Sequence, residues 1–209
     1  MGCILKRPFG TRSKRRSALS AALLLCLLGT GAGAADRYNI DQTNGTIRFE
    51  VENLGLFSSH GEFRRWDGTL TIDQDHPEDS KVDVNIQAGS VVMPWADGAD
   101  LLRSPPFFDV AEHPAAHFTS DAISQIAANH YAIHGVLRLR GISQPQNFEA
   151  TLVDRHVDPV LKTEIADFLV SGTLHRSMFG MTSDRVLISD AVAVVIRFRL
   201  RLGEALRDR

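Results

Sequence analysis

The sequence predicts an all-β protein built as a single antiparallel β-barrel of about eight strands with one short helix. Two observations predict it: apolar and polar residues alternate with a period of two along much of the chain, and only one short segment has a helical pattern. Successive side chains of a strand point to opposite faces, so each alternating segment has one wet side and one dry side. Many such strands bury their dry sides in a sandwich or in a closed barrel, and closure also removes the unpaired sheet edges.

Six segments carry the alternation clearly, and three carry it weakly. The clear segments are residues 46–53, 81–87, 131–140, 148–152, 166–174 and 192–201, and the weaker ones lie near 38–41, 63–73 and 117–124. Asn44-Gly45 and Asp67-Gly68 supply turn signals between or within strands. A helix is expected around residues 97–103, ending before Ser104-Pro105-Pro106, because proline cannot continue a helix.

The first 35 residues have the pattern of a secretory signal peptide. A basic stretch is followed by an apolar run at residues 18–28 and by small residues at 29–35, which suits cleavage near Ala34 or Ala35. The apolar run is too short to span a bilayer, so no stable membrane insertion is expected after cleavage. We therefore expect a leader at residues 1–35, one domain at residues 36–209, and a periplasmic location. The pattern does not decide between general and twin-arginine export.

The charge balance argues against nucleic acid as a partner. The first 35 residues hold six of the 23 Lys and Arg and no Asp or Glu, which leaves 17 basic residues against 25 acidic ones in residues 36–209. A net charge of -8 disfavours binding to phosphate backbones and to anionic membranes. Both cysteines, Cys3 and Cys26, lie in the leader, so the domain itself has no disulfide.

Histidine and serine patterns predict neither a metal site nor an active site. His113/His117 and His130/His134 have zinc-compatible spacing, but no cysteine or carboxylate cluster completes either set. Ser177 lies two residues from His175, so both side chains point to one face of a strand, yet no nucleophile motif surrounds them. The sequence also contains no phosphate-binding glycine loop in residues 36–209. No metal, no cofactor and no catalytic role are therefore expected.

The dry face is rich in phenylalanine. Phe49, Phe63, Phe118, Phe148 and Phe168 belong to it, as does Phe198. A barrel of about eight strands is either packed solid or holds one ligand, and periodicity does not choose between the two.

Several segments, in order, resemble the YceI-like, lipocalin-like polyisoprenoid-binding family. They are Tyr38-Asn39-Ile40-Asp41 with Ile47-Arg48-Phe49, His60-Gly61-Glu62-Phe63 with Gly68-Thr69-Leu70, Leu101-Leu102-Arg103-Ser104 with Phe107-Phe108-Asp109-Val110, His113-Pro114 with His117-Phe118-Thr119-Ser120, Gly135 to Gly141, and Arg176-Ser177-Met178-Phe179-Gly180-Met181. The resemblance implies a lipocalin-like barrel whose lumen binds, stores or transports an isoprenoid lipid, either a polyprenol or an isoprenoid quinone, without catalysis.

The lipid would contact the dry face and the segment around Arg176. The expected binding residues are Phe49, Val51, Phe63, Val84, Phe118, Ile133, Leu137, Phe148, Phe168, Val170, Arg176, Phe179, Met181, Val194, Ile196 and Phe198. Phe179 and Met181 suit an adaptable apolar gate. Arg176 suits either a polar head group or an exterior salt bridge.

Two other functions stay open at this point. One is an enzyme acting on a related lipid, with His60, His175 and Arg176 near the barrel mouth. The other is a filled barrel that serves as an interaction module. A homodimer is also compatible with the sequence.

Overall fold

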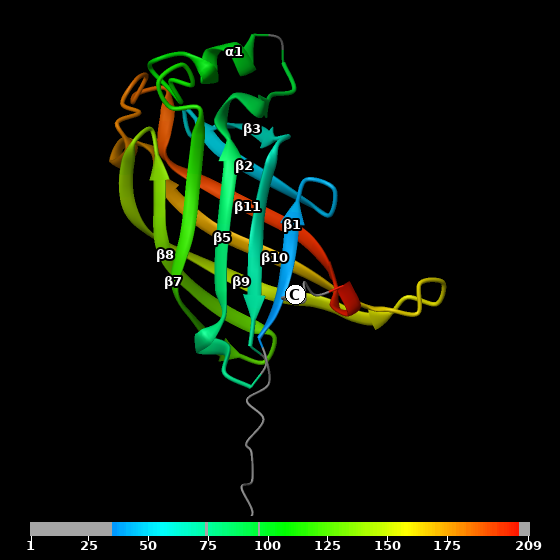
Figure 1. Cartoon of the computed structure of the whole chain (residues 1–209). Coiled ribbons are helices and arrows are strands. Elements are labelled where there is room, and N and C mark those ends of the chain that lie inside the picture. Colours follow the sequence, from blue (N-terminus) through cyan, green and yellow to red (C-terminus); the bar gives the residue numbers. More distant parts are fainter. Residues whose placement is uncertain (1–34, 74, 96, 205–209) are drawn as a thin grey trace, which may run out of the picture. The chain divides into compact units, whose positions relative to one another are not determined.

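The computed structural model describes residues 35–73, 75–95 and 97–204 (Figure 1). The predicted leader, apart from its last residue, lies outside the described residues. The strands are β1 (Asp36–Asp41), β2 (Gly45–Asn53), β3 (Phe57–Phe63), β4 (Trp66–Ile72), β5 (Lys81–Gln87), β6 (Val91–Val92), β7 (Ala115–Ala127), β8 (His130–Leu139), β9 (Ile142–Val157), β10 (Glu164–His175) and β11 (Ile188–Arg201). The helical elements are α1 (Gly98–Arg103) and the single 3-10 turns η1 (Pro77–Asp79), η2 (Ala88–Ser90), η3 (Arg176–Phe179) and η4 (Leu202–Glu204).

All strands join one antiparallel sheet that curls around an apolar interior (Figure 1). The strand order is β1-β4-β5-β7-β8-β9-β10-β11-β2-β3-β6, so most neighbours in the sheet are also neighbours in the chain. The prediction of an all-β, lipocalin-like fold with one short helix is confirmed. The described sheet has eleven strands rather than about eight, and its hydrogen-bonded ladder runs from β1 at one edge to β6 at the other.

The two strands that the sequence did not predict lack an alternating pattern. β3 has the polar sequence Phe-Ser-Ser-His-Gly-Glu-Phe, and β6 has only two residues. A Cβ atom on Gly61 of β3 would overlap the Phe49 ring and the Met93 sulfur. The Phe49 ring of β2 therefore fills the space that a side chain at position 61 would occupy. Because β3 has a glycine there instead of an apolar side chain, its sequence does not alternate clearly.

The dry faces of the strands form two adjoining core clusters. One cluster surrounds Phe118, Phe148 and Phe179, and the other surrounds Tyr38 and Leu200. The second cluster joins β1 to β11, and these two strands also contact each other. Side-chain packing therefore brings the edge strand β1 against the far side of the sheet.

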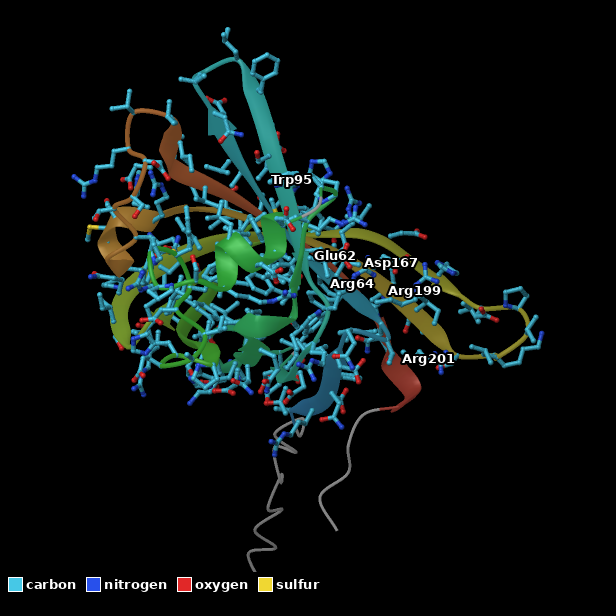
Figure 2. All side chains as sticks on the ribbon, turned by 90° about the horizontal axis from the view of Figure 1, so that it is seen from above. Glu62, Arg64, Trp95, Asp167, Arg199 and Arg201 are labelled. Atoms are coloured by element: carbon cyan, nitrogen blue, oxygen red, sulfur yellow. The ribbon has the colours of Figure 1, made fainter. Side chains whose placement is uncertain are left out.

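The wet faces carry ion pairs between neighbouring strands. Arg199 donates two hydrogen bonds to the Asp167 carboxylate, at 2.7 and 2.8 Å, and these side chains lie on the outside of the curled sheet (Figure 2). Arg48 and Glu62 make a similar exterior pair at 3.1 Å. This confirms the predicted polar sides of residues 46–53 and 192–201.

Helix α1 lies over one end of the curled sheet (Figure 1). Its last residue, Arg103, donates hydrogen bonds to the carbonyl oxygens of Gly89 at 2.9 Å and Val91 at 2.8 Å. The helix ends at Arg103, and the next residue, Ser104, has an extended backbone because a proline follows it. Within the described residues, no helix has the length and hydrophobicity needed to cross a bilayer.

Candidate ligand-binding cavity

The inner face of the sheet encloses a cavity of about 580 Å³. This volume lies inside the range of about 300–1,000 Å³ that is common for small-molecule sites. All the residues that the sequence assigned to lipid binding line the cavity. They are Phe49, Val51, Phe63, Val84, Phe118, Ile133, Leu137, Phe148, Phe168, Val170, Arg176, Phe179, Met181, Val194, Ile196 and Phe198. The structure therefore brings them together on one continuous wall, and whether a lipid contacts them stays a prediction.

Aromatic rings form three groups along this wall. Phe49, Phe63 and Phe108 form a triangle with ring centroids 5.5 to 6.3 Å apart. Phe118 and Phe148 meet edge to face at 5.2 Å, and Phe168 and Phe198 stack at 5.1 Å. Such contacts orient the rings and add to the energy of simple burial. The wall is thus apolar and is shaped by packed rings.

Sequence reasoning missed the part of the wall that comes from the α1 region. Met93, Trp95, Leu102, Phe107 and Phe108 line the cavity there. Loops have no period-two pattern, so the alternation gave no signal for these residues. The adjacent pair Phe107-Phe108 belongs to a segment that carries the family resemblance, which is its only signal in the sequence.

Tyr38 and Trp66 place polar atoms among the apolar side chains. The Tyr38 hydroxyl lies 3.3 Å from the carbonyl oxygen of Leu202 and 3.4 Å from the Asp36 carboxylate. Burial, together with the nearby Asp36 charge, raises the pKa of Tyr38 to about 12, so this group stays neutral. The Trp66 indole N–H is buried and has no hydrogen-bond partner among the described residues.

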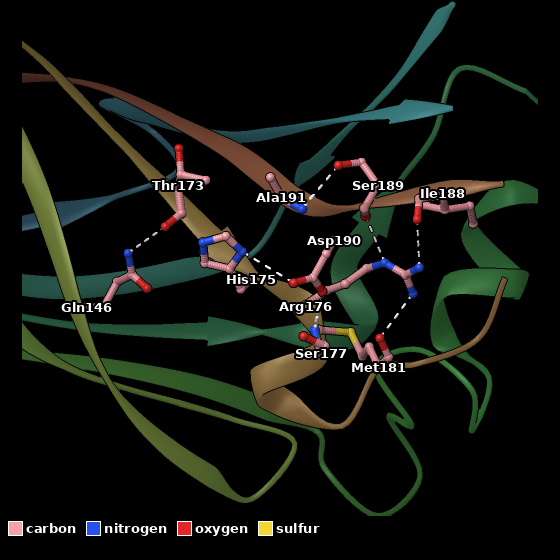
Figure 3. A network of polar contacts seen from close by, with 10 residues as sticks. All are labelled: Gln146, Thr173, His175, Arg176, Ser177, Met181, Ile188, Ser189, Asp190 and Ala191. Carbon is pink, nitrogen blue, oxygen red and sulfur yellow. Dashed lines mark hydrogen bonds and ion pairs between the residues drawn. The ribbon is translucent and has the colours of Figure 1, made fainter. Parts of the chain in front are cut away.

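Arg176 is held by backbone carbonyls, and whether it also meets a lipid head group stays a prediction. The residue is only 4% exposed, and its guanidinium donates to the carbonyl oxygens of Met181, Ile188 and Ser189 at 2.9 to 3.0 Å (Figure 3). It also donates to the carbonyl oxygen of Ser183 at 2.7 Å. Among the described residues it makes no salt bridge, and most of its donors are used by backbone carbonyls. The guanidinium ties the segment after η3 to the start of β11.

His175, Asp190 and Ser177 lie close together but do not form a hydrolytic triad. Asp190 lies between the other two, 3.3 Å from His175 Nδ1 and 2.8 Å from the Ser177 backbone N–H (Figure 3). Partial burial acts to raise the pKa of Asp190, but the bonds from Ser177 and His175 outweigh it and lower the pKa below its usual value. A triad needs the histidine between the serine and the carboxylate, so this order does not activate the serine.

Most of the remaining histidines lie at exterior strand positions, and His76 and His113 lie in loops. His60 is exposed and pairs in register with Glu50, on the face of β3 opposite to the neighbouring Phe49–Gly61 contact. His117 lies 3.0 Å from Asp83, and His134 lies 2.7 Å from Asn147. Within the described ranges, no group of three or more His, Cys, Asp or Glu side chains suits a metal ion. The structure does not bring His60 to His175 and Arg176.

Comparison with known proteins identifies relatives of this chain. A family model described as YceI-like domain matches residues 38–200. The Protein YceI of Salmonella arizonae is 32% identical over 184 residues, which cover 87% of this chain and 95% of that protein.

Solved structures share the fold at low sequence identity. Burkholderia cenocepacia BcnA has a TM-score of 0.69 and 17% identity, covering 77% of this chain and 99% of that one. A structure described as a polyisoprenoid binding domain from Saccharophagus degradans, implicated in plant cell wall breakdown, has a TM-score of 0.55 and 12% identity, covering 80% of this chain and 99% of that one.

Proposed function

The chain belongs to the YceI-like family, and from this premise we propose that it binds an isoprenoid lipid in its cavity. The ligand is a polyprenol or an isoprenoid quinone, which the protein stores or transports without changing it chemically. The observation that carries this proposal is the cavity of about 580 Å³ behind a phenylalanine-rich wall.

The chemistry of the wall suits a long hydrocarbon. Each CH₂ group that leaves water contributes about 0.8 kcal/mol, so a prenyl chain gains affinity along its whole length. The costs of association and of ordering the chain offset part of that gain. Rings of Phe49, Phe63 and Phe108, and the stacked pair Phe168 and Phe198, offer flat apolar surface to the branched chain. A polar or charged ligand would leave its hydrogen-bonding groups unmatched against this wall.

A solved relative supports the ligand class. The Saccharophagus degradans domain that shares this fold is described as polyisoprenoid binding. At 12% sequence identity this likeness shows only a shared fold, so the ligand class is part of our proposal.

A carrier role without catalysis is favoured by the arrangement of the polar groups. Arg176 is committed to backbone carbonyls, and Asp190 separates His175 from Ser177. A general base must reach the group that it activates. His175 does not lie next to the Ser177 hydroxyl in this way, because Asp190 stands between them.

We also propose that the protein works in the periplasm, after cleavage of the leader near Ala34 or Ala35. The basic, apolar and small-residue order of residues 1–35 supports this location. An isoprenoid carrier in that compartment would shield its ligand from water between membranes.

Organic extraction of the purified protein followed by mass spectrometry tests the function. We expect a prenyl lipid in wild-type extracts and much less in extracts of a folded Phe168→Asp variant, which places a carboxylate on the cavity wall. Incubation of the isolated lipid with the protein should return it unchanged. Wild-type extracts without any prenyl lipid, combined with no binding of added lipid, would contradict the carrier role, and turnover of the lipid would select the enzyme.

A further inference from the structure

Two neighbouring loops expose a group of large apolar side chains. Leu54 and Leu56 lie in the β2–β3 turn, Phe57 begins β3, and Val186 and Leu187 precede β11; we call these five residues the apolar tip. Leu56, Phe57 and Val186 are 78%, 70% and 88% exposed. Single exposed apolar residues are common, but a contiguous group on projecting loops marks an interaction surface.

The two loops are held together as one unit. The Leu54 backbone N–H donates to the Leu187 carbonyl oxygen at 2.8 Å, and Asn53 is the register partner of Ile188. Leu54 and Gly55 both adopt left-handed backbone conformations, with φ of 52° and 65°, which closes the turn tightly. The hairpin projects from the body of the sheet next to the other loop (Figure 2). The exposed side chains therefore sit on a defined support.

The apolar tip is continuous with the cavity wall. Val51 and Asn53 of β2 and Ser59 of β3 line the cavity, and so do Ile188 and Val192 of β11. These residues lie on the same strands that carry the tip, within a few positions of it. The same strands therefore connect the tip to the cavity wall.

We infer that the apolar tip inserts into the surface of a lipid bilayer and so holds the cavity next to that bilayer. The choice of a bilayer rests on the proposed function, because a prenyl lipid is stored in a membrane and leaves it slowly through water. The acidic Asp184 and Glu52 offset Arg185, and the nearby Arg176 is buried, so the attraction comes from apolar burial. Residues 36–209 carry a net charge of -8, which also disfavours a docking mode based on anionic lipids.

Flotation with phosphatidylcholine vesicles that contain no anionic lipid tests this inference. The test variant is Leu56→Ser/Phe57→Ser, and it is expected to lower the apparent partition coefficient at least about tenfold. The matched control is Val160→Ser/Leu161→Ser, which removes exposed apolar surface from the β9–β10 hairpin. The backbone N–H groups of Val160 and Leu161 both donate to the Asp158 carboxylate at 2.8 Å, so the turn should keep its shape in this control variant. The control should float like the wild type, and binding should change little with salt.

Three outcomes would overturn the inference. The tip variant and the control could lose binding equally, or the wild type could fail to float. The tip variant could also turn a dimer into a monomer, measured by sedimentation, while vesicle binding is unchanged; the tip would then be covered by a second copy.

A transfer assay separates this inference from the proposed function. The tip variant should take up added prenyl lipid to the same extent as the wild type at equilibrium, but should withdraw it from vesicles more slowly. Wild-type protein that floats through its tip but takes up no prenyl lipid would refute the carrier function while supporting the docking surface. Equal withdrawal rates for variant and wild type would refute the docking surface as the route of delivery.

Discussion

Phe168 and Phe198 stack across the β10–β11 pair, with ring centroids 5.1 Å apart and ring planes 12° from parallel. The two residues are register partners, and both line the cavity. Both are only partly buried, in contrast to Leu200 on the same face of β11, which is 1% exposed. The stack is therefore part of the cavity wall, packed against the core clusters on one side and bordering the cavity on the other.

Replacing Phe168 with alanine should widen the cavity at a modest cost in stability. A buried Phe in a packed core loses about 3–5 kcal/mol on truncation, and Phe168→Ala should lose less because one side of the ring borders the cavity. Affinity for a prenyl chain should change at the same time. Urea unfolding and lipid binding measure the two effects.

Leu200→Ala is the matched control for the packed core. It should cost about 2–5 kcal/mol, because Leu200 is enclosed by the cluster around Tyr38. Phe168→Asp should fold poorly or be purified empty, because apolar surroundings disfavour its charge. A Phe168→Ala variant that unfolds like a core deletion, with no lipid in wild-type extracts, would indicate a filled interior and an interaction module.

Arg176→Met should destabilise the protein by about 2–4 kcal/mol, because four backbone carbonyls lose their donor. Arg176→Lys should restore only part of this loss, since an ammonium group cannot reproduce the planar fork. Urea unfolding gives the stability, and lipid titration gives the affinity. If Arg176→Lys is fully stable but binds lipid weakly, then Arg176 contacts a head group as the sequence suggested.

Gly61→Ala should destabilise the fold by about 1–3 kcal/mol, because the new methyl group meets the Phe49 ring and the Met93 sulfur. Gly89→Ala is the control, since nothing lies within 4 Å of the position that its Cβ would take. It should change stability by less than about 0.5 kcal/mol. Equal unfolding midpoints for the two variants would show that β3 does not accommodate the ring in this way.

Tyr38 should make stability fall at high pH. Its pKa is about 12 in the fold, against 10.0 for the free side chain, so the folded state holds the proton that the unfolded state releases. The contribution is complete below pH 10 and is lost as pH rises toward 12, at about 1 kcal/mol per pH unit. Urea unfolding across this range should show that decline in the wild type and a smaller decline in Tyr38→Phe.

The exported protein should begin at Ala35 or Asp36. The order of basic, apolar and small residues in the first 35 positions predicts this cleavage. N-terminal sequencing of protein from the periplasmic fraction checks it. Recovery of that protein with Met1 intact would refute cleavage, and recovery only from the cytoplasm would refute the location.

The sequence alone determined the strands that have one wet and one dry face. Residues 81–87 alternate clearly and form β5 at those bounds, and residues 192–201 lie within β11. It also identified wall residues such as Phe49, Phe168 and Phe198, because a period-two pattern reports which side of a strand is dry. The ordered family segments completed the prediction of a lipocalin-like sheet.

The tertiary structure decided what alternation cannot encode. β3 was missed because the Phe49 ring lies where a side chain of Gly61 would be, and this contact joins different strands. Arg176 looked like a surface or head-group residue, since only folding brings the carbonyls of Met181, Ser183, Ile188 and Ser189 around it. The loop residues Phe107 and Phe108 follow α1 in the chain and line the cavity. Arg103 holds the end of α1 in place by hydrogen bonds to the carbonyl oxygens of Gly89 and Val91. Whether the dry face leaves space depends on how far opposite walls stand apart, and that separation is a property of the curled sheet and not of any one strand.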